Sequence, residues 1–223
     1  NHSCSLLSHS SADVNDPVKN PHNLLVGEAL VKNLYPGKYG IRAVPPTDQG
    51  SQWVQTATIE GTPGIDTWVK GGEPPYLLEF GAASWHAFIG FVHPMAPPGG
   101  TGRITGRVAK VHESAPPIQN SLFVGEPLSE SWVGLSDLGG TDQQIYAGPC
   151  AADGSFDING VPPGTYLLSA WDRPLDQIID YRTVVVPPEG GLVEVGPVAL
   201  FSWFGTYEGS VFNDANQNGV RDP

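Results

Sequence analysis

The stretch DGSFDINGVPPGTYLLSAW at residues 153–171 decides the fold class of this chain. Its Asp153-Gly154 pair is typical of the turn that closes a β-hairpin. Its Pro163-Gly164 pair joins the fixed φ of proline to a glycine suited to the positive φ of a type II turn. Short apolar alternations lie at residues 156–158 and 166–171. The stretch therefore predicts two strands, each preceded by a tight turn.

The rest of the chain has the same strand-and-turn character. Its 223 residues include 28 Gly and 22 Pro, and 39% are hydrophobic, mostly in short runs. No long stretch keeps the i, i+3, i+4, i+7 apolar spacing of a helix without meeting Gly or Pro. We predict an all-β fold, with strands at residues 29–34, 39–44, 53–59, 65–69, 85–92, 104–111, 132–135, 156–158, 166–171, 181–186, 192–200 and 206–212.

Two internal echoes indicate tandem modules. LYPGKYGI at residues 34–41 resembles VPPGTYLL at residues 161–168, and TGRV at 105–108 is echoed by EGSV at 208–211. The Pro- and Gly-rich segment PMAPPGGT, residues 94–101, reads as a linker. We predict a sandwich module at 1–97 whose opening strands are either missing or diverged, a second module at 102–204, and the start of a third at 205–223, packed through Trp203 and Phe204.

Alternating positions indicate the core of the second module. The inward-facing set predicted from this pattern is Val108, Val133, Leu135, Phe156, Tyr166, Leu168 and Val185. Of the two cysteines, Cys4 and Cys150, each falls in a different predicted module. They are either bridged to one another or buried as free thiols.

Charge and composition exclude several function classes. The formal net charge of −12 repels phosphate backbones, so we expect no nucleic-acid partner. No apolar run is long enough for a membrane span. Neither a G-x-S-x-G elbow nor an H-E-x-x-H pair is present, which favours a protein that is not an enzyme.

Histidines and tryptophans are the other candidate binding residues. His86 and His93 lie seven residues apart, on either side of the predicted strand at 85–92, so their side chains point to opposite faces. They chelate one metal only if a bulge intervenes. His2, Cys4 and His9 match no zinc spacing. The six tryptophans are Trp53, Trp68, Trp85, Trp132, Trp171 and Trp203. Most of them lie inside predicted apolar strands, which favours a role in core packing over a sugar-stacking platform.

The order of motifs between residues 102 and 200 resembles the carboxypeptidase regulatory-like and collagen-adhesin B-type family. The matching features are the strand at 105–108, the D-G-x-F turn at 153–156 and the P-P-G-x-Y turn at 162–166. The resemblance implies an immunoglobulin-like or prealbumin-like sandwich that serves as a spacer or stalk. It also implies Lys110 as the position of a Lys–Asn crosslink found in some members, although no matching Asn lies near the last strand.

The tail GSVFNDANQNGVRDP, residues 209–223, resembles the start of the B-type repeats of serine-aspartate-repeat surface adhesins, and this implies a calcium-stiffened stalk. Its oxygen-bearing residues also recur at positions 1, 3, 5, 7 and 9 of an EF-hand-type loop, with Gly219 at position 6. The predicted calcium ligands are Asp214, Asn216, Asn218, Val220 through its carbonyl, and Asp222. An Asn-Gly hairpin turn without an ion is the alternative.

Together these features predict tandem immunoglobulin-like/prealbumin-like antiparallel sandwiches in a non-catalytic structural module of an extracellular or cell-surface protein, most simply a bacterial one. Such a module would form part of a stalk, sheath, filament or adhesin subunit. Its partners would be neighbouring modules or copies of itself, or a surface glycan or protein ligand. The alternative is a carbohydrate-binding or accessory module of a larger secreted enzyme.

Overall fold

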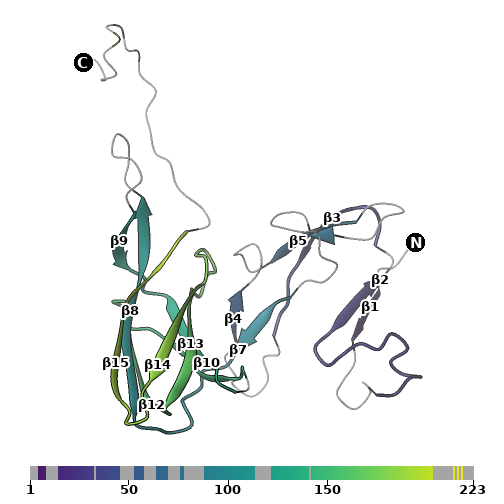
Figure 1. Cartoon of the computed structure of the whole chain (residues 1–223). Coiled ribbons are helices and arrows are strands. Elements are labelled where there is room, and N and C mark those ends of the chain that lie inside the picture. Colours follow the sequence, from purple (N-terminus) through teal and green to yellow (C-terminus); the bar gives the residue numbers. More distant parts are fainter. Residues whose placement is uncertain are drawn as a thin grey trace. The chain divides into compact units, whose positions relative to one another are not determined.

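The chain is all-β in the computed structural model (Figure 1). The structure describes residues 5–8, 15–32, 34–45, 53–57, 64–69, 76–77, 88–113, 122–140, 142–202, 213, 215 and 217. These residues fall into two compact units, the first holding β1, β2, β3, β5 and β6 and the second holding β4, β7 and β8 to β15. Within the described ranges there is no helix of a length and apolarity suited to crossing a membrane.

The first unit contains two small antiparallel sheets. β1 (Ser5–Ser8) pairs with β2 (Ala29–Lys32), and β5 (Ile65–Val69) lies between β3 (Gly37–Ile41) and β6 (Tyr76–Leu77). Ile65 is buried, as the alternation along β5 requires. The strands at 29–34, 39–44 and 65–69 were thus predicted at the right places, while β1 and β6 were not.

The second unit contains a sandwich of two sheets. One sheet has the order β11-β10-β13-β14, and the other has the order β12-β8-β15 with β9 also paired to β8. The strands are β8 (Gly102–Glu113), β9 (Leu122–Pro127), β10 (Ser131–Asp137), β11 (Gln144–Pro149), β12 (Ser155–Val161), β13 (Gly164–Asp172), β14 (Asp180–Val186) and β15 (Gly191–Leu200).

One pairing in this sandwich corrects the expectation of purely antiparallel sheets. β15 runs parallel to β8, with Gly102 opposite Gly191 and Lys110 opposite Leu200. The other strand pairs of the described residues are antiparallel. Periodicity reports which face a side chain takes and says nothing about strand direction, so the sequence pattern did not reveal this pairing.

The core between the two sheets comes from alternate residues of each strand. Six of the seven predicted core residues are buried: Val108, Val133, Leu135, Phe156, Tyr166 and Leu168. The seventh, Val185, is wrong: it is 58% exposed, while its neighbours Val184 and Val186 are buried. Three consecutive valines give no alternation of their own, and the pairing of Val184 with Tyr166 decides which of them face inward.

The two echoed Pro-Gly-x-Tyr segments form the same local contact. Tyr39 Oη donates to the carbonyl oxygen of Tyr35 at 2.9 Å, and Tyr166 Oη donates to that of Pro162 at 2.9 Å. The type II turn predicted at Pro163-Gly164 is wrong, because the φ of Gly164 is not positive. Gly164 is already the first residue of β13, and the ring of Tyr166 lies 3.3 Å from where a Cβ on Gly164 would be.

A two-stranded sheet packs against the second unit's sandwich. β4 (Val54–Ala57) pairs with β7 (Gly90–Val92), and Val54 and Val92 pack with Trp132, Trp171 and Leu175. Residues 53–57 and 90–97 accordingly belong to the second unit. The same unit includes Met95, whose backbone exchanges hydrogen bonds of 2.9 and 3.2 Å with Ala147 of the edge strand β11. These contacts bring part of the predicted linker at 94–101 onto the sandwich.

Candidate functional site

The predicted calcium ligands Asp214, Asn216, Asn218, Val220 and Asp222 lie outside the described residues. Of their loop, the structure describes Ala215 and Gln217, both exposed. Gln217 has a φ of 59°, in the left-handed region, so the backbone bends sharply at position 4 of the predicted loop. The calcium site stays a prediction.

The histidine and cysteine positions are described only in part. His93 stacks against Trp53, with ring centroids 3.4 Å apart and tilted by 41°. His86, and the side chains of His2, Cys4 and His9, lie outside the described residues. Cys150 is half-buried, and this burial raises the pKa of its thiol to about 11, so the thiol stays protonated and a weak nucleophile at neutral pH.

Two of the six tryptophans belong to the interior. Trp132 is 7% exposed and Trp171 is 1% exposed, and their rings lie 6.3 Å apart with a tilt of 31°. Buried rings offer no stacking surface to a sugar, so these two support the predicted core role. Trp53 is half-buried, while Trp85, Trp203 and the side chain of Trp68 lie outside the described part of the chain.

A small group of charges lies on the β8–β9 ribbon. Lys110 Nζ is 3.2 Å from Glu126 Oε1, and His112 Nε2 contacts Glu126 Oε2. The contact with His112, followed by the backbone and Lys110, lowers the pKa of Glu126 to about 2. Lys110, the residue implied in a crosslink, is therefore ion-paired with a carboxylate on a neighbouring strand.

A tight loop between β13 and β14 is organised by a buried carboxylate. Asp172 is 2% exposed and accepts hydrogen bonds from the backbone N–H groups of Asp176 at 2.9 Å and Gln177 at 3.0 Å. Burial raises the pKa of Asp172, and these two N–H groups oppose the rise. Leu175 has a φ of 64°, a conformation that costs a non-glycine residue about 1 kcal/mol or more, and it is buried against Trp171.

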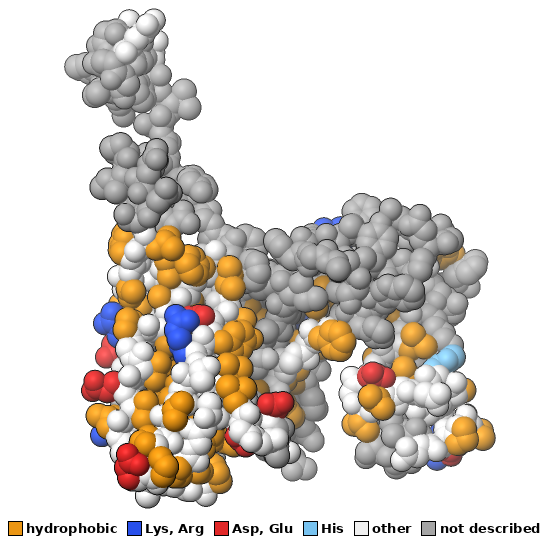
Figure 2. Space-filling model, viewed as in Figure 1, with side chains coloured by type: hydrophobic (Ala, Val, Ile, Leu, Met, Phe, Trp, Pro, Cys, Tyr) orange, Lys and Arg blue, Asp and Glu red, His pale blue; other side chains and the backbone are white. Residues whose placement is uncertain are grey.

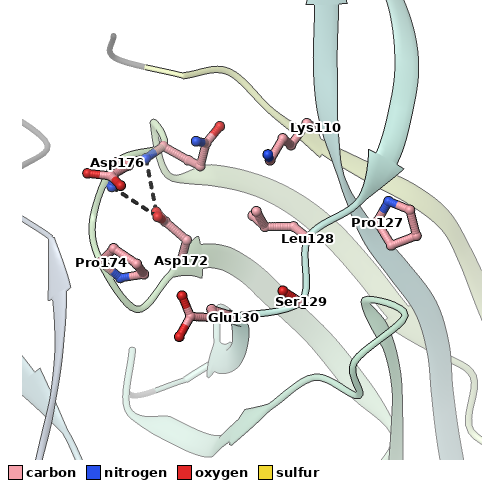
Figure 3. Close-up of a pocket in the computed structure, with 9 residues that line it drawn as sticks. Lys110, Pro127, Leu128, Ser129, Glu130, Asp172, Pro174 and Asp176 are labelled. Carbon is pink, nitrogen blue, oxygen red and sulfur yellow. Dashed lines mark hydrogen bonds between the residues drawn. The ribbon is translucent and has the colours of Figure 1, made fainter.

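Next to this loop lies a hollow lined by described residues (Figure 3). Its volume is about 220 Å³. Lys110 contributes from β8, residues 127–130 from the turn after β9, and Asp172, Pro174, Asp176 and Gln177 from the loop after β13. Figure 3 shows the Asp172 carboxylate on one side of the hollow and Lys110 on another. The described residues contain no cluster of three His, Cys, Asp or Glu placed to hold a metal ion.

Sequence reasoning did not identify this pocket. The local sequence carries no ordinary Asx-turn signal, because the residue two after Asp172 is Pro174, which has no N–H to donate. Asp172 instead accepts from the N–H groups of Asp176 and Gln177. The other side of the pocket, residues 127–130, lies at the end of β9, a strand that was not predicted. The meeting of these two segments therefore could not be predicted from the sequence.

Hydrophobic side chains also lie on the outside of this unit, as Figure 2 shows in orange. Leu122, Phe123 and Val124 at the start of β9 are each about half exposed, and Phe201, just after β15, is 42% exposed. Because Lys110 is opposite Leu200, Phe201 follows β15 beside the same end of β8. The end of the sandwich at which the chain leaves is therefore partly apolar.

Comparison with known proteins gives only distant likenesses. No family model matches the chain, and no curated protein matches it. A DUF3823 family protein from Parabacteroides merdae is 19% identical over 48% of this chain and 46% of its own, with a TM-score of 0.30. The group B streptococcus pilus 2b backbone protein is 15% identical over 62% and 49%, with a TM-score of 0.30. A minor pilin of Streptococcus agalactiae is 12% identical over 92% and 98%, with a TM-score of 0.35.

The chain thus spans about half the length of the first two of these proteins. Superpositions with such TM-scores do not establish a common arrangement of strands. The functional proposal below therefore depends on this chain's own geometry.

Proposed function

We propose that this chain is a non-catalytic structural module of an extracellular or cell-surface protein, most simply a bacterial one, that transmits tension along a stalk or filament. The proposal depends on one observation, the parallel pairing of β8 with β15 in the second unit. The first strand of the sandwich and its last strand are neighbours and run in the same direction.

This pairing determines how a pulling force would act on the sandwich. Because the two strands are parallel, the chain enters at the start of β8 and leaves from the opposite end of β15. Their ladder is about 30 Å long, and its hydrogen bonds lie across the strand direction. A force applied between the two ends therefore shears many bonds together, whereas a force that separates one end of a hairpin breaks them in sequence.

Single-molecule force spectroscopy on the full chain tests this proposal. With Cys4 and Cys150 replaced by alanine, handles are attached at Thr101→Cys and Ser202→Cys, which load the β8–β15 ladder in shear. We expect this geometry to resist several times the force of the control, because forced unfolding follows the barrier along the loaded direction.

The control geometry uses the same protein with handles at Pro163→Cys and Pro188→Cys. These positions flank the paired residues Gly164 and Val186, so force there opens β13 from β14 one pair at a time. Equal unfolding forces in the two geometries would contradict a load-bearing role for the β8–β15 pairing.

Calcium binding at Asp214, Asn216, Asn218, Val220 and Asp222 is a second part of the proposal, supported by the spacing of oxygen donors and by the sharp bend at Gln217. Position 12 of the loop would be residue 225. In a chain extended past that residue we expect calorimetry to detect calcium binding with a Kd of about 10⁻⁴–10⁻³ M, as in extracellular modules.

In the same titration Asp214→Ala should abolish the heat of binding, since it removes the ligand at position 1. Asn213→Ala is the matched control, because Asn213 is exposed and outside the ligand set. Identical heats from both variants would leave the hairpin turn without an ion as the better interpretation.

For partners, we propose neighbouring modules. The segment at 205–223, the predicted start of a third module, is joined by residues 201–204 to the end of the sandwich that exposes Leu122, Phe123 and Phe201. A short tether gives that segment a high effective concentration at this apolar end. The alternative function, a carbohydrate-binding accessory module, is less well supported because Trp132 and Trp171 are buried.

A further inference from the structure

The pocket beside the β13–β14 loop contains an acceptor without a donor. Gln177 is 8% exposed and lines the pocket, and its Oε1 atom is buried with no hydrogen-bond partner. Buried carbonyl oxygens in folded proteins are nearly always hydrogen-bonded. Oε1 is shielded from solvent in this conformation, so a rotation of the Gln177 amide toward the pocket would let an entering donor make the hydrogen bond that the protein alone does not make.

The charges around this oxygen favour a cation. Asp172, Asp176 and Glu130 line the pocket, and Lys110 is the one basic residue among its lining side chains. The ammonium group of Lys110 is already 3.2 Å from Glu126, so its charge is largely offset. The pocket thus keeps an excess of acidic groups.

The walls favour an alkyl chain behind that cation. Pro127, Leu128 and Pro174 contribute apolar surface to the lining. A divalent metal ion fits poorly, because calcium takes six to eight oxygen ligands and the described residues hold no suitable acidic cluster. A primary ammonium on an alkyl stem matches both parts, since the stem packs on the apolar wall and the head donates three hydrogen bonds.

We propose that this pocket binds a primary alkylammonium group, such as a lysine side chain of a neighbouring polypeptide, with its N–H donating to Gln177 Oε1. The carboxylates of Asp172, Asp176 and Glu130 supply the compensating charge. The proposal is independent of the structural role proposed above, because it concerns a ligand rather than the response to force.

Nuclear magnetic resonance on the full chain tests it, with Nα-acetyl-lysine N-methylamide as the probe. We expect saturable shifts of the Gln177 side-chain amide and of the backbone amides of Asp176 and Gln177. The norleucine analogue, which lacks the ammonium, should cause none. Cadaverine, titrated separately, distinguishes a free diamine from a lysine side chain, and binding of either supports the alkylammonium pocket.

Two variants locate the binding. Gln177→Leu removes the acceptor and should weaken probe binding by about tenfold, the size of one hydrogen bond to a charged group. Asp176→Asn changes an exposed residue, so it keeps the test valid if the first variant does not fold, and it should also weaken binding. Gln143→Leu, at an exposed glutamine in the turn before β11, is the matched control and should bind as the native chain does.

Four results would overturn the proposal. The first is no saturable shift with the lysine probe or cadaverine, and the second is an equal response to the norleucine analogue. The third is unchanged affinity in both Gln177→Leu and Asp176→Asn. A response of the same signals to calcium alone would also overturn it, in favour of a metal site.

Discussion

Replacing Trp171 with alanine is expected to lower the free energy of unfolding by about 3–5 kcal/mol, the range for removing a large buried aromatic side chain. Trp171 is 1% exposed and packs with Trp132, Val54 and Leu175, so its loss leaves a cavity between the sandwich and the β4–β7 sheet. Its Nε1 atom has no hydrogen-bond partner, so the substitution leaves no buried acceptor unpaired. The decrease in the free energy of unfolding therefore comes from lost packing. Urea denaturation measures this loss.

Tyr181→Ala is the control for this experiment, because Tyr181 is an aromatic residue that is 48% exposed on β14. It should change the free energy of unfolding by less than about 1 kcal/mol. Hydrogen exchange at the Val54 amide should also become faster in Trp171→Ala, since the β4–β7 sheet loses a buried contact with the sandwich. Similar destabilisation by both substitutions would show that the tryptophan cluster is not part of the cooperative core.

Replacing Gly154 with alanine should be nearly as harmful, by about 3 kcal/mol or more. Gly154 has a φ of 75°, which costs alanine about 1–2 kcal/mol by itself. In addition, a Cβ at this position would collide with the carbonyl oxygen of Val108 and would lie 3.3 Å from the backbone nitrogen of Leu128. Two backbones meet here, because Val108 N donates to Gly154 O at 2.8 Å.

Gly196→Ala separates the two contributions. Gly196 has nearly the same φ, 73°, but no atom lies within 4 Å of the Cβ that would be added there. Thermal or urea denaturation should therefore show the backbone cost alone for Gly196→Ala and a larger loss for Gly154→Ala. Equal decreases in the free energy of unfolding would mean that the β8 backbone moves easily to make room for the added Cβ, and that the close approach at Gly154 is unimportant.

The sequence predicted the strands that carry strong alternation but not two strands at the margins of the sandwich. β9 and β11 read as loops, because LFVGEP and QIYAGP each end in Gly or Pro. β11 is an edge strand and β9 pairs only with β8, so neither needs every backbone N–H for a second neighbour. Gly and Pro at their ends are therefore tolerated, and a pattern search that penalises these residues misses the strands.

Local sequence was informative about single turns. A tight turn does lie at Asp153-Gly154, and Gly154 has a positive φ. The predicted hairpin is wrong, because β11 and β12 on either side of this turn belong to different sheets. The pocket required Asp172, Gln177 and Leu128 to meet, and Leu128 is separated from the loop after β13 by four strands, β10 to β13. Such a convergence depends on the sheet order β10-β13, which alternation does not encode.

The parallel pairing of β8 with β15 also sets the order of events during synthesis. β8 leaves the ribosome long before β15, because Gly191, the partner of Gly102, is synthesised much later. Pairings between residues so distant in sequence form slowly. Until β15 arrives, β8 has one unpaired edge along Ile104 and Val108, which are buried in the finished sandwich. A chain stalled or cleaved before Gly191 thus presents an apolar strand edge, the kind of surface that nucleates aggregation and recruits chaperones.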